Sequence, residues 1–329
     1  LNLGITQEAE DALKRFGSSL FDSEVSTFEP VDNIPVPEGY RLGVGDELRV
    51  MFMGKEQGNF PLIIERDGSV TLPKLGRVVL SGLTFPEAKT LIEKQVNEQL
   101  IGSEAILSMG PLRSINVFMA GEVKRPGNYS LSSLTTLSQS IFMAGGISET
   151  GTYRSVELKR QGKTVESFDL YDLLLSGDNS RDARLRSGDV VFVPVRGPQV
   201  SVAGEVLRPA IYEIIEGEDV AGLLKMAGGV KAEGNPQQVL LRRYKPGASL
   251  PSIQNLNLRD RDGLVLRVVD GDALTIPSMS KRVSNPIVIE GDTELEDLFG
   301  WTEGLKIADI FNDLEADVQP TADLNLSLI

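Results

Sequence analysis

The sequence predicts a multi-domain α+β protein in which a first compact unit is followed by tandem copies of one mixed-sheet module. Three observations lead to this prediction. A long segment that includes Gly121 recurs in related form around Gly204, and a tandem repeat is one folding unit copied. Each copy contains short apolar runs bounded by glycine and proline, typical of strands, and one helical run. The region before the copies has a helix with a clear start signal beside alternating strand patterns.

The repeat keeps one offset, which we call the repeat offset, over its main landmarks. The segment INVFMAGEVKRPGNY, which ends at Tyr129, returns around Gly204. Duplicated modules usually build surfaces for binding and assembly, so the repeat favours a binding or assembly protein over an enzyme. The repeat offset connects Gly121 to Gly204, Pro126 to Pro209, Gly145-Gly146 to Gly228-Gly229, Gly188-Asp189 to Gly271-Asp272, and Pro194 to Pro277.

A third copy begins near the C-terminus at a slightly longer offset, which we call the third-copy offset. Gly291 lies opposite Gly204, and Ile307-Ala308 lies opposite Val220-Ala221. The sequence stops in the middle of a predicted strand, and half a module cannot bury its own apolar face. We therefore expect a longer natural protein of which this chain is a fragment. The first residue is Leu1 rather than Met, which indicates a processed or trimmed N-terminus.

Composition excludes several function classes. The 329 residues include no Cys and no His, which excludes disulfides, zinc–thiolate sites and Ser-His triads. The net charge is −14, and no basic stripe is present to contact nucleic-acid phosphates. We therefore expect no metal, no cofactor, no nucleic acid and no catalytic residue. No apolar run approaches the roughly 18 residues of a membrane-spanning helix.

Acidic residues are concentrated between positions 290 and 323. The simplest interpretation is a solvated acidic face. A calcium cluster is the alternative, although it lacks the spacing and the glycine of an EF-hand loop. Its members would be Glu290, Asp292, Glu294, Glu296 and Asp297.

Residues 1–38 are expected to form an extended N-terminal arm. A short helix is predicted for Glu8–Phe16, where Gly17 ends it. The rest of the arm should be irregular because prolines interrupt regular structure. These are Pro30, Pro35 and Pro37.

Residues 39–111 are expected to form the first compact unit. A turn from Gly43 to Asp46, which includes Gly45, opens a strand whose apolar residues alternate with polar ones. Asp67-Gly68 separates two short apolar runs, which is a strong hairpin signal. Thr84 and Glu87 form a capping box at the start of a helix with an apolar period. This helix should lie on a sheet.

Residues 112–197 and 198–282 are expected to fold alike. In each copy a strand ends in Gly-Glu-Val and a turn follows. Arg125–Asn128 suits a type II turn in which Gly127 supplies a positive φ. The second copy has Ala210 in place of this glycine, which favours a type I turn. A short strand, a helix that ends at Gly-Gly, two further strands and a last strand after Gly-Asp complete one mixed sheet covered by one helix.

Three motifs resemble catalytic or nucleotide-binding sites, and each has a simpler structural interpretation. Gly162-Lys163-Thr164 lacks the preceding glycine that a P-loop requires, and it predicts a hairpin turn. Gly146–Gly151 has one residue too many for a nucleophile elbow, and no His could activate its Ser. Asp189 and Asp272 could form a glycosidase pair, but both follow Gly at the same repeat position, where Asp supports a turn.

Glu122 and Glu205 are the candidate contact residues. Each lies at a strand end close to an arginine, Arg125 or Arg208. One alternative is a surface ion pair with that arginine, which contributes little energy. The other is contact with a neighbouring subunit or with a saccharide hydroxyl, in which Asn128 would take part.

A family resemblance emerges from these segments. YRLGVGDELRVMFMG, followed by DGSVTLPKLGRVVLSGLTFPEA, resembles the signature domain of bacterial outer-membrane polysaccharide export proteins. The units with AGEV, RPG, AGG and SGDVVFVP resemble the β-grasp modules called SLBB, for soluble ligand-binding β-grasp. The resemblance covers residues 39–282 well, and residues 283–329 resemble a truncated third SLBB-like repeat. The order of the domains supports the resemblance more than either motif does. The longer members of the family also have a Pro-rich arm before the export domain, as this chain does.

The resemblance implies transport without catalysis. Family members form rings in the periplasm of Gram-negative bacteria, attached to the outer membrane, and give capsule or exopolysaccharide a route to the surface. The implied partners are polysaccharide, other copies of the same chain in head-to-tail contact, and an inner-membrane co-polymerase. The lipidation Cys and the closing amphipathic helix of some members are absent, so contact with the outer membrane would use parts missing here, and this part alone should not form a pore.

Two other functions stay open. A soluble periplasmic protein that binds an oligosaccharide or a small molecule is the alternative, because related β-grasp modules occur in proteins proposed to bind small ligands. Its site would be framed by the turns after Gly121 and Gly204. An enzyme acting on polysaccharide has only the abundant carboxylates in its favour.

Overall fold

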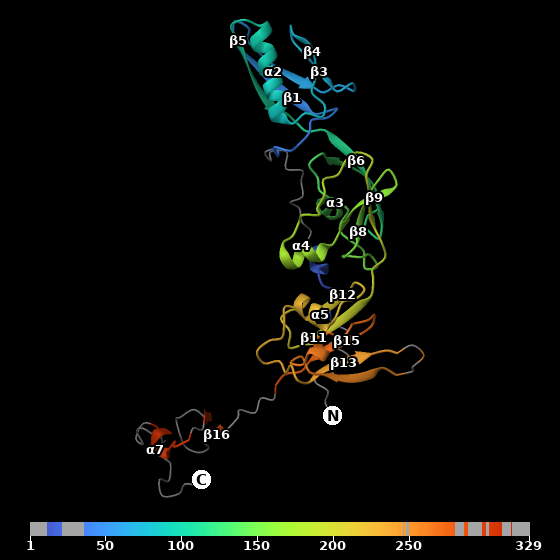
Figure 1. Cartoon of the computed structure of the whole chain (residues 1–329), viewed down its shortest axis with the longest axis vertical. Coiled ribbons are helices and arrows are strands. Elements are labelled where there is room, and N and C mark those ends of the chain that lie inside the picture. The colour runs from blue at the N-terminus through green and yellow to red at the C-terminus, as the bar shows by residue number, and fades with distance from the viewer. Residues whose placement is uncertain are drawn as a thin grey trace. The chain divides into compact units, whose positions relative to one another are not determined.

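The computed structural model describes residues 12–21, 36–245, 247, 250–279, 286–288, 298–300, 303–310 and 317. The chain divides into two compact units, Leu1–Pro277 and Ser278–Ile329, and each is described by itself. The first unit contains an N-terminal domain and two similar modules, and the second contains a strand pair and a short helix (Figure 1). The fold is α+β, as the sequence predicts.

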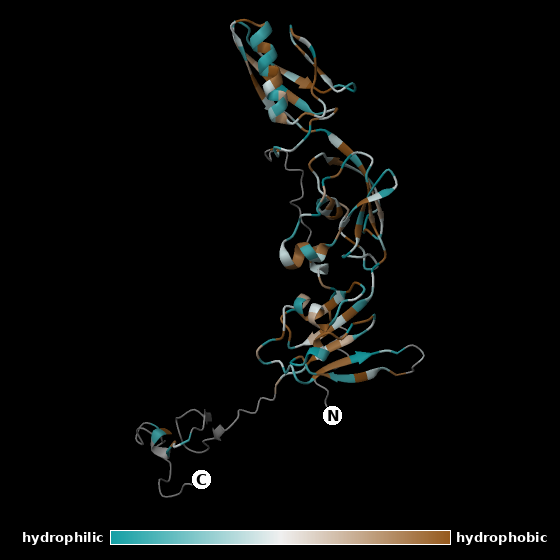
Figure 2. Cartoon of the chain, viewed as in Figure 1, coloured by the Kyte–Doolittle hydropathy of each residue, from teal (hydrophilic) through white to brown (hydrophobic). Residues whose placement is uncertain are grey.

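The N-terminal domain packs one helix on a small antiparallel sheet. β1 is the central strand of a sheet in the order β2-β1-β5, and β3 and β4 form a separate hairpin. Helix α2 packs against β5, and its visible side is mostly hydrophilic (Figure 2). The expected capping box of Thr84 and Glu87 is present, and α2 buries Ala88, Ile92 and Val96. The bounds are β1 Glu47–Gly54, β2 Gly58–Ile63, β3 Ser69–Leu72, β4 Gly76–Val79, α2 Phe85–Gln99 and β5 Ser103–Met109.

The predicted hairpin at Asp67-Gly68 is wrong in its pairing. The turn itself is present, because Gly68 has a φ of +82° and Asp67 accepts hydrogen bonds from the amide and hydroxyl of Ser69. However, β2 pairs with β1, whereas β3 pairs with β4. The carbonyl of Gly68 accepts hydrogen bonds from the amides of Leu80 and Ser81, which hold the turn against the end of β4. The apolar runs on the two sides of the turn therefore join different sheets.

The first module is a five-stranded mixed sheet in the order β7-β6-β10-β8-β9. β6 and β10 are parallel neighbours, and the other pairs are antiparallel. Helix α3 begins with a capping box of Thr136 and Gln139 and ends before the Gly-Gly pair. The β8–β9 connection turns at Gly162 (φ +76°), which confirms the predicted hairpin turn. The bounds are β6 Ser114–Gly121, β7 Gly127–Ser132, α3 Leu137–Met143, β8 Val156–Arg160, β9 Lys163–Phe168, α4 Leu170–Ser176 and β10 Val190–Val193.

The second module repeats the first down to its pairing register. Val200 faces Tyr212 across the first strand pair, as Val117 faces Tyr129 in the first module, and the strand order is the same. The buried residues of both modules form one continuous hydrophobic core, so the modules pack on each other through apolar surface. The bounds are β11 Gln199–Gly204, β12 Ala210–Glu213, α5 Val220–Met226, β13 Val239–Arg243, β14 Ser252–Leu256, α6 Arg261–Leu264 and β15 Ala273–Ile276.

The β-turns predicted after the Gly-Glu-Val segments are wrong. β7 begins at Gly127 and β12 at Ala210, so the preceding proline leads directly into a strand. Gly127 has a φ of +149°, whereas the corresponding residue of a type II turn has a φ of roughly +80°. The physical reason is that the loop is held by the end of a helix and does not close on itself: the amide of Arg125 donates to the carbonyl of Ala144.

The helix expected for Glu8–Phe16 is wrong over its described part, and residues 8–11 lie outside the described residues. Arg15 forms a parallel bridge with Ile211 of β12. A 3-10 helix, η1, covers Ser18–Phe21 after Gly17. An isolated short helix is marginal in water, whereas pairing with a sheet edge satisfies the backbone of this segment.

The second compact unit contains a strand pair with a familiar register. β16 (Pro286–Val288) is antiparallel to β17 (Leu298–Gly300), with Ile287 opposite Phe299. At the third-copy offset this pair corresponds to Val200 opposite Tyr212. Helix α7 (Ile307–Ile310) begins at the same offset from the start of α5. The acidic residues considered for a calcium site lie outside the described residues.

Among the described helices, none combines the length and apolar character required to cross a membrane.

Candidate interaction site

The Gly-Glu-Val loop of each module is fixed by a close backbone approach. Gly121 and Gly204 have φ angles of +77° and +83°. A Cβ on either residue would lie 2.1 Å from the carbonyl oxygen of Val193 or Ile276, the last residue of the module's last strand. Only glycine fits there. The next amide in the chain donates to the same oxygen, so the loop starts from a rigid position.

The carboxylates of Glu122 and Glu205 contact their own modules. Glu122 accepts hydrogen bonds from the hydroxyls of Ser148 and Thr150. Glu205 forms an ion pair with Lys231 at 3.3 Å. In both modules the carboxylate thus contacts the segment that follows the helix.

The arginines of the two loops are exposed. Arg125 donates to the carbonyl of Met143 at the end of α3 (3.2 Å), so the ion pair expected with the glutamate of its own loop is not formed. The guanidinium of Arg208 lies 6.0 Å from the ring centre of Phe16. Asn128 is exposed on the edge strand β7. These side chains are accessible to another molecule.

The repeat landmarks of each module meet at one place. In the first module the amides of Lys124 and Arg125 donate to the carbonyls of Gly146 and Ala144 at the end of α3. The φ angles of the Gly-Gly pairs, Gly145-Gly146 and Gly228-Gly229, lie between +80° and +97°, a conformation that glycine adopts readily. The second module has the same two bonds, from Leu207 to Gly229 and from Arg208 to Ala227.

Each Gly-Asp turn carries an ion pair between a buried aspartate and a partly exposed arginine. The carboxylate of Asp189 binds Arg160 through two hydrogen bonds of 2.7 Å, and Asp272 binds Arg243 at 2.8 and 2.6 Å. Each carboxylate also accepts a hydrogen bond from the backbone amide three residues earlier, which closes the turn. These hydrogen bonds raise the pKa of both arginines. Since both oxygens of each aspartate are engaged, neither serves as a general acid or a nucleophile.

Asp46 plays a related role at the boundary between the N-terminal domain and the first module. Its carboxylate accepts hydrogen bonds from the Tyr40 hydroxyl, the Gly43 amide and the Arg113 guanidinium (2.6 Å). The Tyr40 hydroxyl lies 2.9 Å from the hydroxyl of Ser133 in the first module. Burial raises the pKa of Tyr40, which keeps the phenol neutral as a donor.

Sequence reasoning missed the arginine partners of these aspartates. Arg160 and Arg243 are related by the repeat offset, as are the aspartates that they bind, so the repeat could have identified both. Arg113 has no such signal, because it connects two different folds.

The junction between the two modules is centred on one carboxylate that the sequence analysis also missed. Glu213 is 2% exposed. It accepts hydrogen bonds from the Thr152 hydroxyl, the Tyr153 amide (2.8 Å), the Gly197 amide (2.9 Å) and Arg15 (2.9 Å). The donors belong to the first module, to the N-terminal arm, and to residues 194–198, the connecting segment between β10 and β11. The acceptor belongs to the second module. We call Glu213 the junction carboxylate.

Arg154 adds a second polar link across the same junction. It pairs with Asp169 of its own module (2.9 Å) and with Glu218 of the second module (2.8 Å). Its guanidinium lies 5.0 Å from the ring centre of Tyr171. Burial acts to lower the pKa of Arg154, but the two carboxylates outweigh this effect and raise it. Burial also raises the pKa of Asp169 and of Tyr171.

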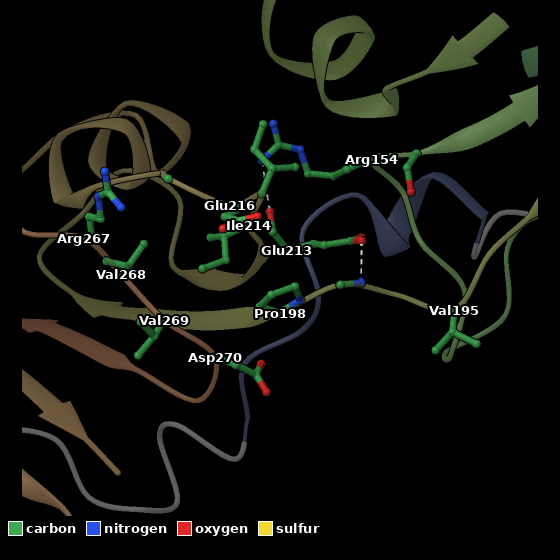
Figure 3. A pocket seen from close by; sticks show the side chains of 14 residues that line it. Arg154, Val195, Pro198, Glu213, Ile214, Glu216, Arg267, Val268, Val269 and Asp270 are labelled. Atoms are coloured by element: carbon green, nitrogen blue, oxygen red, sulfur yellow. Dashed lines mark hydrogen bonds between the residues drawn. The ribbon is translucent and has the colours of Figure 1, made fainter. Parts of the chain in front are cut away.

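A cavity of about 630 Å³ opens beside the junction carboxylate. Figure 3 shows residues of both modules around it, with Glu213 bonded to the backbone of the connecting segment. Three exposed apolar side chains lie at its rim: Val195, Ile215 and Val269. Arg267, Glu216 and Asp270 also line it. The cavity thus combines apolar walls with charges of both signs.

The buried carboxylates described above are engaged in structural contacts. In the part of the chain that the structure describes, no group of three or more Asp and Glu side chains is placed to hold a metal ion. The most deeply buried carboxylates of the sites above are committed to arginines and backbone amides. Such groups position loops and domains.

Comparison with known proteins assigns these parts. Residues 34–107 match the polysaccharide biosynthesis/export protein family, and residues 116–193 and 199–252 each match the SLBB domain. Residues 34–107 thus resemble this family, and the two modules that follow resemble SLBB domains. We therefore call the N-terminal domain the export domain and the two modules SLBB domains of the β-grasp type. The junction carboxylate lies in the second SLBB domain and receives its donors from the first.

Two groups of relatives match the chain in part. The chain is 25% identical to the polysialic acid transport protein KpsD of Escherichia coli over 205 residues, which are 62% of this chain and 36% of KpsD. It is 27% identical to the EPS I polysaccharide export outer membrane protein EpsA of Ralstonia nicotianae over 256 residues, 69% of this chain and 66% of EpsA. The match therefore covers less than two thirds of either relative.

Proposed function

We propose that this chain is a non-catalytic component of capsule or exopolysaccharide export that works in the periplasm and at the outer membrane of a Gram-negative bacterium. The observation that carries the proposal is the order of an export domain followed by SLBB domains. Relatives that match part of the chain are named for polysialic acid transport and for outer-membrane polysaccharide export.

The geometry is compatible with positioning and binding rather than with chemistry. The repeat landmarks of each SLBB domain meet at the Gly-Glu-Val loop, where Arg125 and Arg208 are exposed on a rigid base. Exposed guanidinium groups on a fixed backbone suit contact with polar or acidic partners. We infer that these loops, with Glu122, Glu205 and Asn128, contact polysaccharide or a neighbouring subunit.

The same proposal implies two protein partners, which are other copies of the chain and an inner-membrane co-polymerase. We infer that copies of the chain assemble head to tail into a ring, and that an inner-membrane co-polymerase delivers the polysaccharide. We also infer that residues 283–329 begin a third SLBB domain, since the register of β16 and β17 equals that of β11 and β12 at the third-copy offset.

A second candidate function is soluble ligand binding, and the junction cavity favours it. A volume of about 630 Å³ with apolar walls and a few charges is within the range of small-molecule sites. Titration calorimetry of the intact chain with oligosaccharides and small polar ligands distinguishes the two functions. Saturable micromolar binding by a monomer supports ligand binding.

The export function is tested by deleting the gene and measuring surface and periplasmic polysaccharide separately. We expect loss of polysaccharide at the surface, with retention or shut-down of synthesis inside, because an exporter controls passage and not chain chemistry. Unchanged surface polysaccharide contradicts the proposal.

Point variants then test the loops. Complementation with the double variant Arg125→Ala and Arg208→Ala should lower surface polysaccharide while the protein accumulates at its normal level. Lys163→Ala is the matched control, since Lys163 is an exposed cation at the start of β9. Equal export by the two variants removes the arginines from the proposed contact.

A further inference from the structure

The N-terminal segment 12–21, which we call the strap, lies between the two SLBB domains. In Figure 1 its 3-10 turn is the blue element beside α4 and β12. The amide of Ile211 donates to the carbonyl of Lys14 (3.0 Å), and the amide of Phe16 donates to the carbonyl of Ile211 (2.9 Å). The strap therefore extends the edge of the second SLBB sheet, a common way to bind an extended peptide.

The aromatic side chains of the strap fill a groove whose walls come from both domains. The ring of Phe16 stacks on Tyr212 of the second domain (centroids 5.2 Å apart) and meets Tyr171 of the first edge-on (5.0 Å). The ring of Phe21 lies 5.7 Å from that of Tyr153 in the first domain. Aromatic contacts of this kind contribute beyond their buried area.

Arg15 gives the strap its specificity. Its guanidinium pairs with the junction carboxylate Glu213 at 2.9 Å, donates to the carbonyl of Gly151 at 2.6 Å, and lies 3.7 Å from the ring centre of Tyr153. The side chains of Arg15 and Glu213 are 10% and 3% exposed. A buried carboxylate left without its cation is costly, so the groove selects an arginine at this position.

The glycine that follows Phe16 in the strap is also constrained. Gly17 has a φ of +83°, and a Cβ there would lie 2.9 Å from a methyl carbon of Leu174 in α4. Arg15 therefore contacts the carboxylate of Glu213, and Phe16 contacts two tyrosine rings. Gly17 lies close to the side chain of Leu174. Three adjacent positions of the strap are each matched by a different feature of the groove.

The first SLBB domain lacks this site at its equivalent edge. At the repeat offset, Asn128 replaces Ile211 and the exposed Ser130 replaces Glu213. The edge of β7 thus has neither the carboxylate nor the buried setting that Arg15 requires. The strap site belongs to the junction and not to the SLBB fold in general.

We propose that the groove between the SLBB domains is a docking site for an extended Arg-Phe-Gly peptide, and that its occupant is this chain's own strap, which locks the two domains into one unit. The proposal commits to an intramolecular occupant because the strap is seated in the groove. It is independent of what the protein exports.

Hydrogen exchange of the full-length chain tests the proposal. In the double variant Arg15→Ala and Phe16→Ala, we expect the Ile211 amide, which donates to the strap, to exchange at least about tenfold faster. The Tyr153 amide, which donates to Glu213 across the junction, should also exchange faster. A synthetic peptide with the sequence of residues 12–21, added in excess, should restore protection, and a scrambled peptide should not.

A milder variant keeps the test valid if the double variant fails to fold. Gly17→Ala strains the strap backbone and crowds Leu174 of α4, so it should raise exchange at Ile211 by a smaller factor. Ser19→Ala is the control because its side chain makes no contact on which the docking argument depends. Unchanged exchange at Ile211 in both strap variants overturns the docking site. Faster exchange that the peptide does not reverse also overturns it, since the strap would then act only through folding.

Discussion

The two SLBB domains share a fold and differ where they meet other parts of the chain. Both keep the positive-φ glycines, the loop bound to the helix end and the aspartate–arginine pair at the same offset. The edge strands differ: Ser130 is exposed in the first domain, and Glu213 at the equivalent position is buried in the second. Duplication therefore preserved the residues that fold a domain and altered those that join one domain to the next.

The partners of the junction carboxylate diverged with it. Thr152, Tyr153 and Arg154 of the first domain face the second, whereas the second domain has Asn235, Pro236 and Gln237 at these repeat positions. A junction therefore needs changes on both of its sides.

Glu213→Ala should have the largest effect on stability. We expect the free energy of unfolding of the second SLBB domain to fall by about 3–5 kcal/mol, since the buried Arg15 would lose its carboxylate partner and the amides of Tyr153 and Gly197 would lose their acceptor. Urea unfolding of the full-length chain, followed by circular dichroism, measures this loss. Ser130→Ala is the matched control at the same repeat position, and its effect should stay within about 0.5 kcal/mol. Equal effects would remove the distinction between the two edges.

Asp189→Asn and Asp272→Asn should have intermediate and similar effects. Each replaces a buried carboxylate that binds an arginine through two bonds, and we expect a loss of about 2–3 kcal/mol in each domain. The measurement is again urea unfolding, now comparing the two variants with each other. A loss confined to one domain would mean that the shared turn has a different role in each copy.

Tyr212→Phe should have the smallest effect at neutral pH and a distinct effect at high pH. The variant loses the hydrogen bond to the Arg208 carbonyl (2.6 Å), which costs about 1 kcal/mol. Burial raises the pKa of Tyr212 from 10.0 to about 12. The folded state thus binds the phenolic proton more tightly than the unfolded state. The resulting stability is fully present below pH 10 and is lost as the pH rises through 12.

The variant lacks this titration, so its stability should fall less steeply than that of the original chain between pH 10 and 12, by about 2–3 kcal/mol in total. Thermal unfolding at pH 8, 10, 11 and 12 measures the difference. A constant difference across this range would show that Tyr212 ionises equally in the folded and unfolded chain.

The sequence was sufficient to predict the features that are local or repeated. The capping box at Thr84, the helices that end at Gly-Gly and the hairpin turn at Gly162 each depend on residues close together in the chain. The fold class followed from these elements and from the repeat offset.

The remaining features depend on contacts between distant segments, which the local pattern does not contain. The residues flanking Asp67-Gly68 join different sheets because Leu80 and Ser81 bind the turn from the far end of β4. The arm is held by Ile211, which lies in the second SLBB domain and far away in sequence, rather than by its own helical bonds. The local sequence around Glu213 is that of an exposed edge strand. Its buried role depends on Arg15 and Thr152, which are distant in sequence.

The parallel pairing of β6 with β10, and of β11 with β15, determines how such a protein can change in evolution. A domain whose first and last strands run in the same direction receives the chain at one end of its sheet and releases it at the other. A further copy can be inserted after the last strand without reorganising the domains already present. The number of domains can therefore change by one whole domain at a time. Each added domain requires one new junction between domains, such as the one formed by Glu213 and its donors.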